Sequence, residues 1–246
     1  MGNFVKWLGA GLGFSVGGPI GSILGYVVGS FIDGFTKEDI ERAKAYGSVN
    51  SHVQSGDFEI SLLLLSATII KADGKIDQRE LVYVRNHFKN MYGAERASHA
   101  FKLFNGFIKN NNISTRQVCV QIRQNLTHAS RLQLLHFLFG IAKADGIVIE
   151  NEVHTIKTIA GYLYINLYDF ESIKAMFYDT IDSSYKILEI DKSVADSEVK
   201  KAYRKMVKKY HPDKLRHLGD EHMKGAEEKF RQVQKAYEHI QKERGM

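Results

Sequence analysis

VKKAYRKMVKKYHPDK, residues 199–214, is the stretch that decides the fold of the C-terminal region. Its apolar residues recur at helical spacing and form one stripe, while lysines and an arginine fill the opposite face. The stripe consists of Val199, Ala202, Tyr203, Met206, Val207 and Tyr210. Pro212 has no amide hydrogen, and it disfavours the helical conformation at His211. The helix is therefore predicted to end near Tyr210, before a loop that displays His211, Pro212 and Asp213.

A second amphipathic segment follows this loop and has a comparable length. Its apolar stripe consists of Ala226, Phe230, Val233, Tyr237 and Ile240. Two such faces can pack antiparallel as a helical hairpin. The shorter apolar segment at residues 185–188 is expected to brace the pair. Because the strong apolar periods of the whole chain are helical, and no convincing run alternates as a strand does, we predict an all-α fold.

Residues 183–246 resemble a J domain of the DnaJ family. Four blocks carry the resemblance: SYKILEI (184–190), VKKAYRK (199–205), KYHPDK (209–214) and FRQVQKAY (230–237). The resemblance implies a partner, a DnaK-type heat-shock chaperone. In the family, the basic helix docks on an acidic surface of DnaK, and the loop tripeptide promotes ATP hydrolysis by that partner.

The family's contacts can be carried over residue by residue. The positions that match the DnaK-docking residues are Lys200, Arg204, Lys205 and Lys214. The positions that match the DnaK-stimulating tripeptide are His211, Pro212 and Asp213. The chain departs from the family's pattern at two places in the loop: Leu215 stands where many relatives have a polar residue, and the loop Leu215–Gly225 is longer than usual.

The charge of the chain is concentrated in this region. Residues 183–246 hold 16 Lys and Arg against 11 Asp and Glu, whereas the whole chain has a net charge of +6. A basic patch accelerates encounter with an acidic partner and makes binding salt-dependent. Nucleic-acid binding by the same helix is the rival reading of this charge. We do not expect it, because most Phe and Tyr residues are placed as core and not as a surface on which bases could stack.

The N-terminal segment at residues 7–32 contains no charged side chain. As a helix it would span about 39 Å, enough to cross a hydrocarbon core of about 30 Å with tilt. Glycine recurs along one face at every fourth residue: Gly9, Gly13, Gly17, Gly21, Gly25 and Gly29. Such a face lets two helices approach closely in a membrane, so a homodimer through this segment is one option. A re-entrant hairpin, kinked at Pro19, and a soluble glycine-rich loop are the alternatives.

The flanking charges predict how the segment is oriented. Lys37, Arg42 and Lys44 follow it, whereas Lys6 alone precedes it. The positive-inside rule therefore favours a cytoplasmic C-terminus, and the resemblance requires the same because DnaK is cytosolic. The single cysteine, Cys119, permits no intrachain disulfide, as is typical of a reducing compartment. We expect a protein of the bacterial inner membrane with the bulk of its chain in the cytoplasm.

The middle of the chain contains an internal repeat. IKADG at residues 70–74 and AKADG at 142–146 each follow one apolar helical run and precede another. The glycines suit helix ends, and the acids near each turn suit helix capping. The alternatives are a peptide-docking surface and a Ca²⁺ or Mg²⁺ site. The metal-ligand candidates are Asp73, Glu80, Asp145 and Glu152, although neither loop has EF-hand spacing.

The repeat resembles the TerB-like helical fold. A glycine-rich N-terminal segment, a TerB-like middle and a C-terminal J domain occur together in DjlA-type co-chaperones, and all three parts are found here in that order. The expected domains are a membrane segment (1–32), a linker (33–56), a TerB-like helical domain (57–178) and a J domain (183–246).

The function that this resemblance implies is that of a membrane-anchored co-chaperone that docks on DnaK and stimulates its ATP hydrolysis. The alternative is a TerB-like metal-sensing or protein-interaction scaffold that uses the J domain only for recruitment. The sequence contains no phosphate-binding loop, no HExxH and no CxxC motif. We therefore expect no enzymatic activity of its own, and no cofactor apart from the candidate divalent metal.

Overall fold

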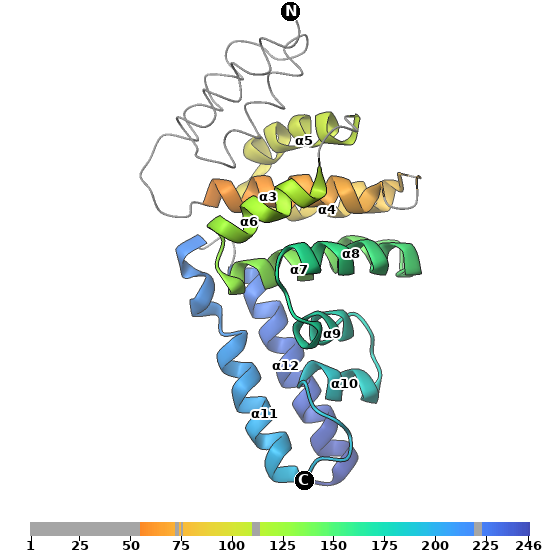
Figure 1. The fold of residues 1–246 in the computed structure, drawn as a ribbon, viewed down its shortest axis with the longest axis vertical. Coiled ribbons are helices and arrows are strands. Elements are labelled where there is room, and N and C mark those ends of the chain that lie inside the picture. The colour runs from red at the N-terminus through yellow and green to blue at the C-terminus, as the bar shows by residue number, and fades with distance from the viewer. Residues whose placement is uncertain (1–54, 72–73, 75, 110–113, 219–222) are drawn as a thin grey trace, which may run out of the picture. The chain divides into compact units, whose positions relative to one another are not determined.

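A computed structural model describes residues 55–71, 74, 76–109, 114–218 and 223–246. Every regular element in these ranges is a helix, and they contain no strand, which confirms the all-α fold (Figure 1). The glycine-rich segment and residues 33–54 of the predicted linker lie outside the described residues. Among the helices that are described, none combines the length and the apolar character needed to cross a bilayer.

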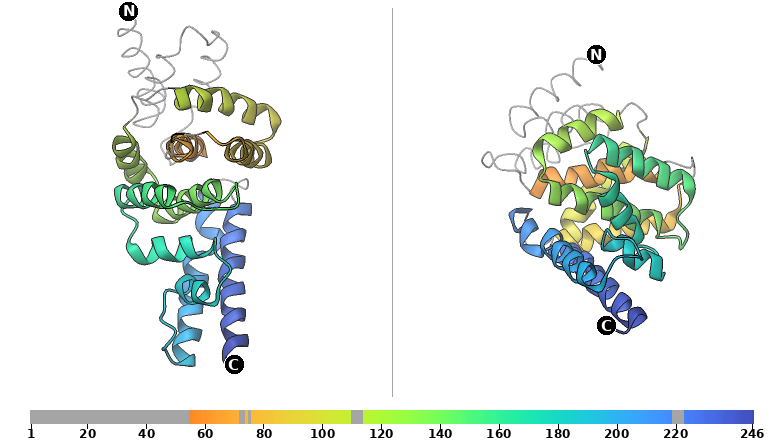
Figure 2. Two further views of the ribbon diagram at one scale, coloured as in Figure 1. Left: turned by 90° about the vertical axis from the view of Figure 1, so that its right-hand side faces the viewer. Right: turned by 60° about the horizontal axis from the view of Figure 1, so that its bottom comes forward.

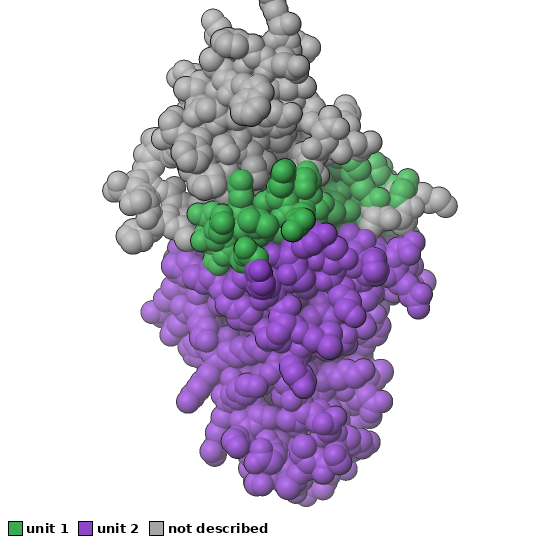
Figure 3. All heavy atoms as spheres, in the orientation of Figure 1, with its two compact units in different colours: residues 1–126 green, residues 127–246 purple. Residues whose placement is uncertain are grey.

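The chain divides into two compact units, Met1–Leu126 and Thr127–Met246, which Figure 3 shows in different colours. The division falls inside the expected TerB-like domain. The second half of that domain therefore shares a compact unit with the J domain.

The described part of the first unit consists of four helices, α3 (Ser55–Ile70), α4 (Gln78–Tyr92), α5 (Ala94–Lys109) and α6 (Thr115–Asn125). Helix α3 packs against each of the other three. Its sequence is apolar over most of its length, and nearly all of its described side chains are buried. A helix that is apolar on every face has to be covered on every side, which explains its central place in this unit.

The second unit contains α7 (His128–Ala142), α8 (Glu150–Tyr162), α9 (Leu167–Ala175), α10 (Ile181–Ile187), α11 (Asp196–Lys209), the 3₁₀ helix η1 (Pro212–Leu218) and α12 (Met223–Arg244). Helices α11 and α12 run antiparallel, side by side, as the views in Figures 1 and 2 show. Helix α10 braces α12. This arrangement is the predicted helical hairpin with its short brace.

The apolar stripes of the hairpin form its core. Val199, Met206, Val233 and Ile240 are fully buried between the helices. The aromatic rings of Tyr203 and Tyr237 stack between the two helices, with their centroids 4.2 Å apart. Burial of a full aliphatic side chain contributes about 1.5–3 kcal/mol to folding, so these stripes are the main source of the hairpin's stability.

Helix α7 joins the hairpin to the helices that precede it in this unit. It contacts α8 and α9 on the TerB-like side, and η1 and α12 on the J-domain side. Twelve of its fifteen residues are buried. The J domain therefore packs against α7, through η1 and α12, and against α9, through α10.

Candidate functional site

The tripeptide His211-Pro212-Asp213 follows the C-terminal end of α11. The helix ends at Lys209, and the amide of its cap residue, Tyr210, donates a 2.9 Å hydrogen bond to the carbonyl of Met206. Pro212 is the first residue of η1, a position where its missing N–H costs no hydrogen bond and its fixed φ suits a helical turn. The helix ends as the sequence predicted, because Pro212 cannot continue it.

The side chains of the tripeptide are open to solvent. His211 and Asp213 are 49% and 54% exposed, so a partner can reach both. The Asp213 amide donates to His211 Nδ1 at 3.3 Å, which places the proton of a neutral imidazole on Nε2. Arg216 lies 3.1 Å from the Asp213 carboxylate, and the His211 ring stands edge-on to Phe230 at 6.1 Å. The loop therefore displays a donor nitrogen and a carboxylate at its surface.

The four predicted docking residues also lie on the surface of this domain. Lys200 and Arg204 lie one helical turn apart on α11 and are exposed. Lys205 is exposed and forms a 3.0 Å ion pair with Glu189. Lys214 follows the tripeptide in η1 and is exposed. The predicted docking residues are thus exposed along α11 and in η1, and the stimulating tripeptide lies between these two elements.

The inner side of the loop is anchored in the core. Leu215, which the sequence marked as a departure from many relatives, is buried together with Leu218. Burial of the Lys229 ammonium beneath the loop lowers its pKa to about 7. Its nitrogen lies 5.7 Å from the centre of the Tyr210 ring. The side chains of the tripeptide are therefore exposed, whereas Leu215 and Leu218, which follow it in η1, are packed in the core.

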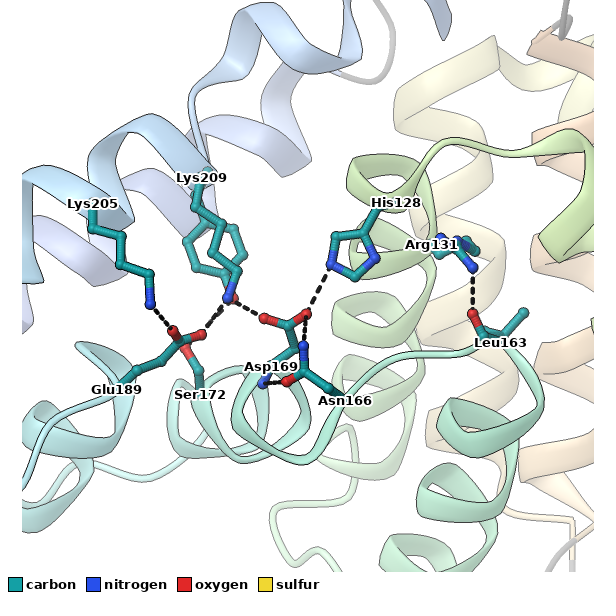
Figure 4. A network of polar contacts seen from close by, with 10 residues as sticks. His128, Arg131, Leu163, Asn166, Asp169, Ser172, Glu189, Lys205 and Lys209 are labelled. Carbon is teal, nitrogen blue, oxygen red and sulfur yellow. Dashed lines mark hydrogen bonds and ion pairs between the residues drawn. The ribbon is translucent and has the colours of Figure 1, made fainter.

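A polar network between α9 and the J domain fixes the other side of α11 (Figure 4). At its centre is Asp169, in the first turn of α9, whose side chain is 2% exposed. His128 Nε2 bonds to its carboxylate at 2.8 Å, and Asn166 donates to it at 3.1 Å. Lys209, at the end of α11, forms ion pairs with both Asp169 and Glu189. The carboxylate of Asp169 thus connects α7, α9 and α11.

The environment of Asp169 keeps it ionised. Burial alone would raise the pKa of this carboxyl, but the hydrogen bonds from His128 and Lys209 outweigh burial and lower the pKa to about 2. Asp169 is therefore negatively charged at neutral pH, and Lys209 has a permanent partner there.

Further contacts join α7 and α9 to the J domain. Ser172 Oγ donates to the carbonyl of Ile187 at 2.9 Å and lies 3.4 Å from the hydroxyl of Tyr210. Ser130 Oγ lies 3.2 Å from Nε2 of His217 in η1. These contacts reach residues on both sides of the tripeptide, so α7 and α9 hold the segment that carries it.

Sequence reasoning missed this network. The spacing of Asn166 and Asp169 was a readable sign of a helix start, and Asn166 does cap α9 by accepting from the Asp169 amide at 2.9 Å. The pairing of Asp169 with His128 and Lys209, each about 40 residues away, has no local signal. Only the tertiary packing of α7, α9 and α11 brings these side chains together.

The repeated turns have the conformation that their glycines indicated. Gly74 and Gly146 have φ of 77° and 99°, which few residues other than glycine adopt readily. At the start of α4, Asp77 accepts a 2.7 Å hydrogen bond from the Arg79 amide. At the start of α8, Glu152 accepts one of 2.9 Å from the Ile149 amide.

The four metal-ligand candidates have different surroundings. Glu80 and Glu152 are buried in the first turns of their helices, and Asp145 accepts a 3.0 Å hydrogen bond from the Ile147 amide. Asp73 lies outside the described residues. Within the described ranges, no three His, Cys, Asp or Glu side chains lie close enough to hold a metal ion together. A divalent metal at these residues stays a prediction.

Three regions of the chain match known protein families. Residues 1–49 match the co-chaperone DjlA transmembrane domain, residues 59–175 match the tellurite resistance protein TerB, and residues 183–245 match the DnaJ domain. No solved structure matches the chain.

Several relatives are similar over different lengths. The co-chaperone protein DjlA of Coxiella burnetii is 28% identical over 266 residues, 98% of each chain. That of Photobacterium profundum is 28% identical over 279 residues, again 98% of each chain. The chaperone protein DnaJ of Fusobacterium nucleatum subsp. nucleatum is 50% identical over 54 residues, 22% of this chain and 14% of that protein. With a DjlA-type transmembrane domain, a TerB domain and a J domain in this order, the chain belongs to the DjlA-type, DnaJ-like co-chaperones.

Proposed function

We propose that this membrane-anchored co-chaperone docks its J domain on a DnaK-type chaperone and stimulates ATP hydrolysis by that chaperone. The observation that carries the proposal is the half-exposed tripeptide His211-Pro212-Asp213 at the end of the cationic helix α11. The family match of residues 183–245 supports the same partner.

The two parts of this surface have separate tasks in the proposed mechanism. The cationic side chains of α11 attract the acidic surface of the partner and orient it, which raises the association rate at low salt. The tripeptide then acts on the partner's catalytic state. A ligand shifts an equilibrium only when it binds the two states with different affinity. His211 and Asp213 therefore have to bind the hydrolysing state of the chaperone more strongly than its other state.

The test of this mechanism is the variant His211→Gln. Glutamine keeps a polar side chain but removes the ring that packs edge-on to Phe230. We expect a folded protein that no longer accelerates ATP hydrolysis by a DnaK-type chaperone in single-turnover assays. The control is His154→Gln, which changes an exposed histidine on α8 and should leave the acceleration unchanged. Full acceleration by His211→Gln would refute the role of the tripeptide.

We also propose that the J domain faces the cytoplasm at a bacterial inner membrane. The three basic residues that follow the N-terminal segment, against one before it, support this orientation. The test is proteolysis of membrane vesicles that contain the full chain. We expect residues 55–246 to be digested in inside-out vesicles and protected in right-side-out vesicles. The reverse pattern would contradict the orientation.

A further inference from the structure

A groove of about 770 Å³ runs beside α11 in the second unit. One wall is formed by Lys205 and Lys208 of α11, together with Lys214 of η1. The opposite wall comes from the TerB-like helices and includes His128, Asn166 and Tyr168. The predicted docking face of α11 therefore continues across a groove onto the first turn of α9.

The charged groups that this groove exposes to solvent are mainly positive. The carboxylates of Asp169 and Glu189 are nearly buried and are already paired with Lys209 and Lys205. Lys208 and Lys214 are exposed, and neither forms an ion pair with any described residue. Because the two inner acids are neutralised from within, the exposed charges of the groove are those of Lys205, Lys208 and Lys214 against the single carboxylate of Asp191, which leaves the groove positive toward an approaching acidic surface.

Tyr168 lies at the rim of the same groove and is 75% exposed. The side chain of Tyr168 forms no hydrogen bond and no ring contact with another described residue. Its backbone belongs to a turn that is held by the Asn166 cap and by the network around Asp169. Tyrosine in a rigid setting supplies a large contact area at a small entropic cost, and it is enriched among the residues that dominate binding energy.

We propose that the first turn of α9, through Tyr168, is a second part of the docking surface for the acidic face of the DnaK-type partner. This inference rests on the proposed function. Two observations support this partner. The exposed lysines of the groove complement an acidic surface, and the groove is continuous with the exposed cations of α11. The TerB-like domain then contributes to recognition directly and is more than a spacer between membrane and J domain.

The test compares two tyrosines in the full chain held in detergent micelles. We expect Tyr168→Ala to raise the Kd for an ATP-bound DnaK-type chaperone about 5- to 30-fold, as for a buried interface tyrosine. Tyr168→Phe keeps the ring and should bind nearly as the unchanged chain does. The matched control is Tyr164→Ala, because Tyr164 is 68% exposed but is not among the residues that line the groove. Its Kd should not change.

Stimulation at saturating concentration separates this inference from the proposed function. Tyr168→Ala should still accelerate hydrolysis fully once it is bound, because the tripeptide is intact. An unchanged Kd for Tyr168→Ala, or an equal loss for Tyr164→Ala, would overturn the inference and leave the proposed function standing. Full stimulation by His211→Gln, in contrast, would overturn the proposed function and, with it, the inference that rests on it.

Discussion

At the N-terminal end of α11, Lys200 and Arg204 extend into solvent, whereas at its C-terminal end Lys209 is enclosed by Asp169 and Glu189. Lys208, the neighbour of Lys209, is exposed like the first two. One helix thus carries cations for two purposes. The exposed ones are available to a partner, and the enclosed one attaches α11 to α9.

The difference follows from helical geometry. Successive residues on a helix point about 100° apart, so Lys208 and Lys209 point in different directions. Both lysines line the groove, but Lys209 reaches the nearly buried carboxylates of Asp169 and Glu189 at its base, whereas Lys208 is exposed to solvent. A run of lysines on a basic helix is therefore not uniform, and its members should respond differently to substitution.

The largest expected effect is that of Lys209→Met. This change removes the lysine that Asp169 and Glu189 share. Glu189 keeps its ion pair with Lys205, but the nearly buried Asp169 keeps only His128 and Asn166 as partners, and a buried charge that loses its cation is costly. We expect a loss of about 3 kcal/mol in the free energy of unfolding, measured by urea denaturation. Lys208→Met is the matched control and should change stability by less than about 0.5 kcal/mol. Equal effects of the two changes would erase the distinction between enclosed and exposed lysines.

A smaller effect concerns pH. The pKa of Asp169 is lowered from 3.8 to about 2 in the folded chain, so its carboxylate contributes stability above pH 4 and loses that contribution as the pH falls toward 2. Between pH 4 and pH 2, we expect the free energy of unfolding to fall by about 2 kcal/mol less in Asp169→Asn than in the unchanged chain. Denaturation curves at several pH values measure this difference. The unchanged chain, measured over the same pH range, supplies the control, and equal pH dependence of the two proteins would contradict the role of Asp169.

Much of the J domain could be predicted from the sequence because its signals are local. The stripe from Val199 to Tyr210 gave the helix and its buried face, and Pro212 gave its end. The all-α class and the positive φ at Gly74 and Gly146 were readable for the same reason. Each depends on neighbours within a few turns of the chain.

The surroundings of α11 could not be predicted in this way. Lys205, assigned to docking, also pairs with Glu189, and Leu215, noted only as a departure, is a core residue. His128 and Asp169 drew no attention, because their connection to Lys209 depends on how three helices pack. Sequence periodicity determines which face of a helix is buried, but not what covers it.

The sequence by itself determined the helical hairpin, the exposed tripeptide and the basic character of α11, since periodicity, proline chemistry and charge act within short stretches. Only the tertiary structure decided that α7 and α9 pack against the J domain, that Lys209 is enclosed by Asp169 and Glu189, and that Tyr168 lines a groove beside the docking helix. The physical reason is that ion pairs and grooves form between segments about 40 residues apart, and no local preference encodes their meeting.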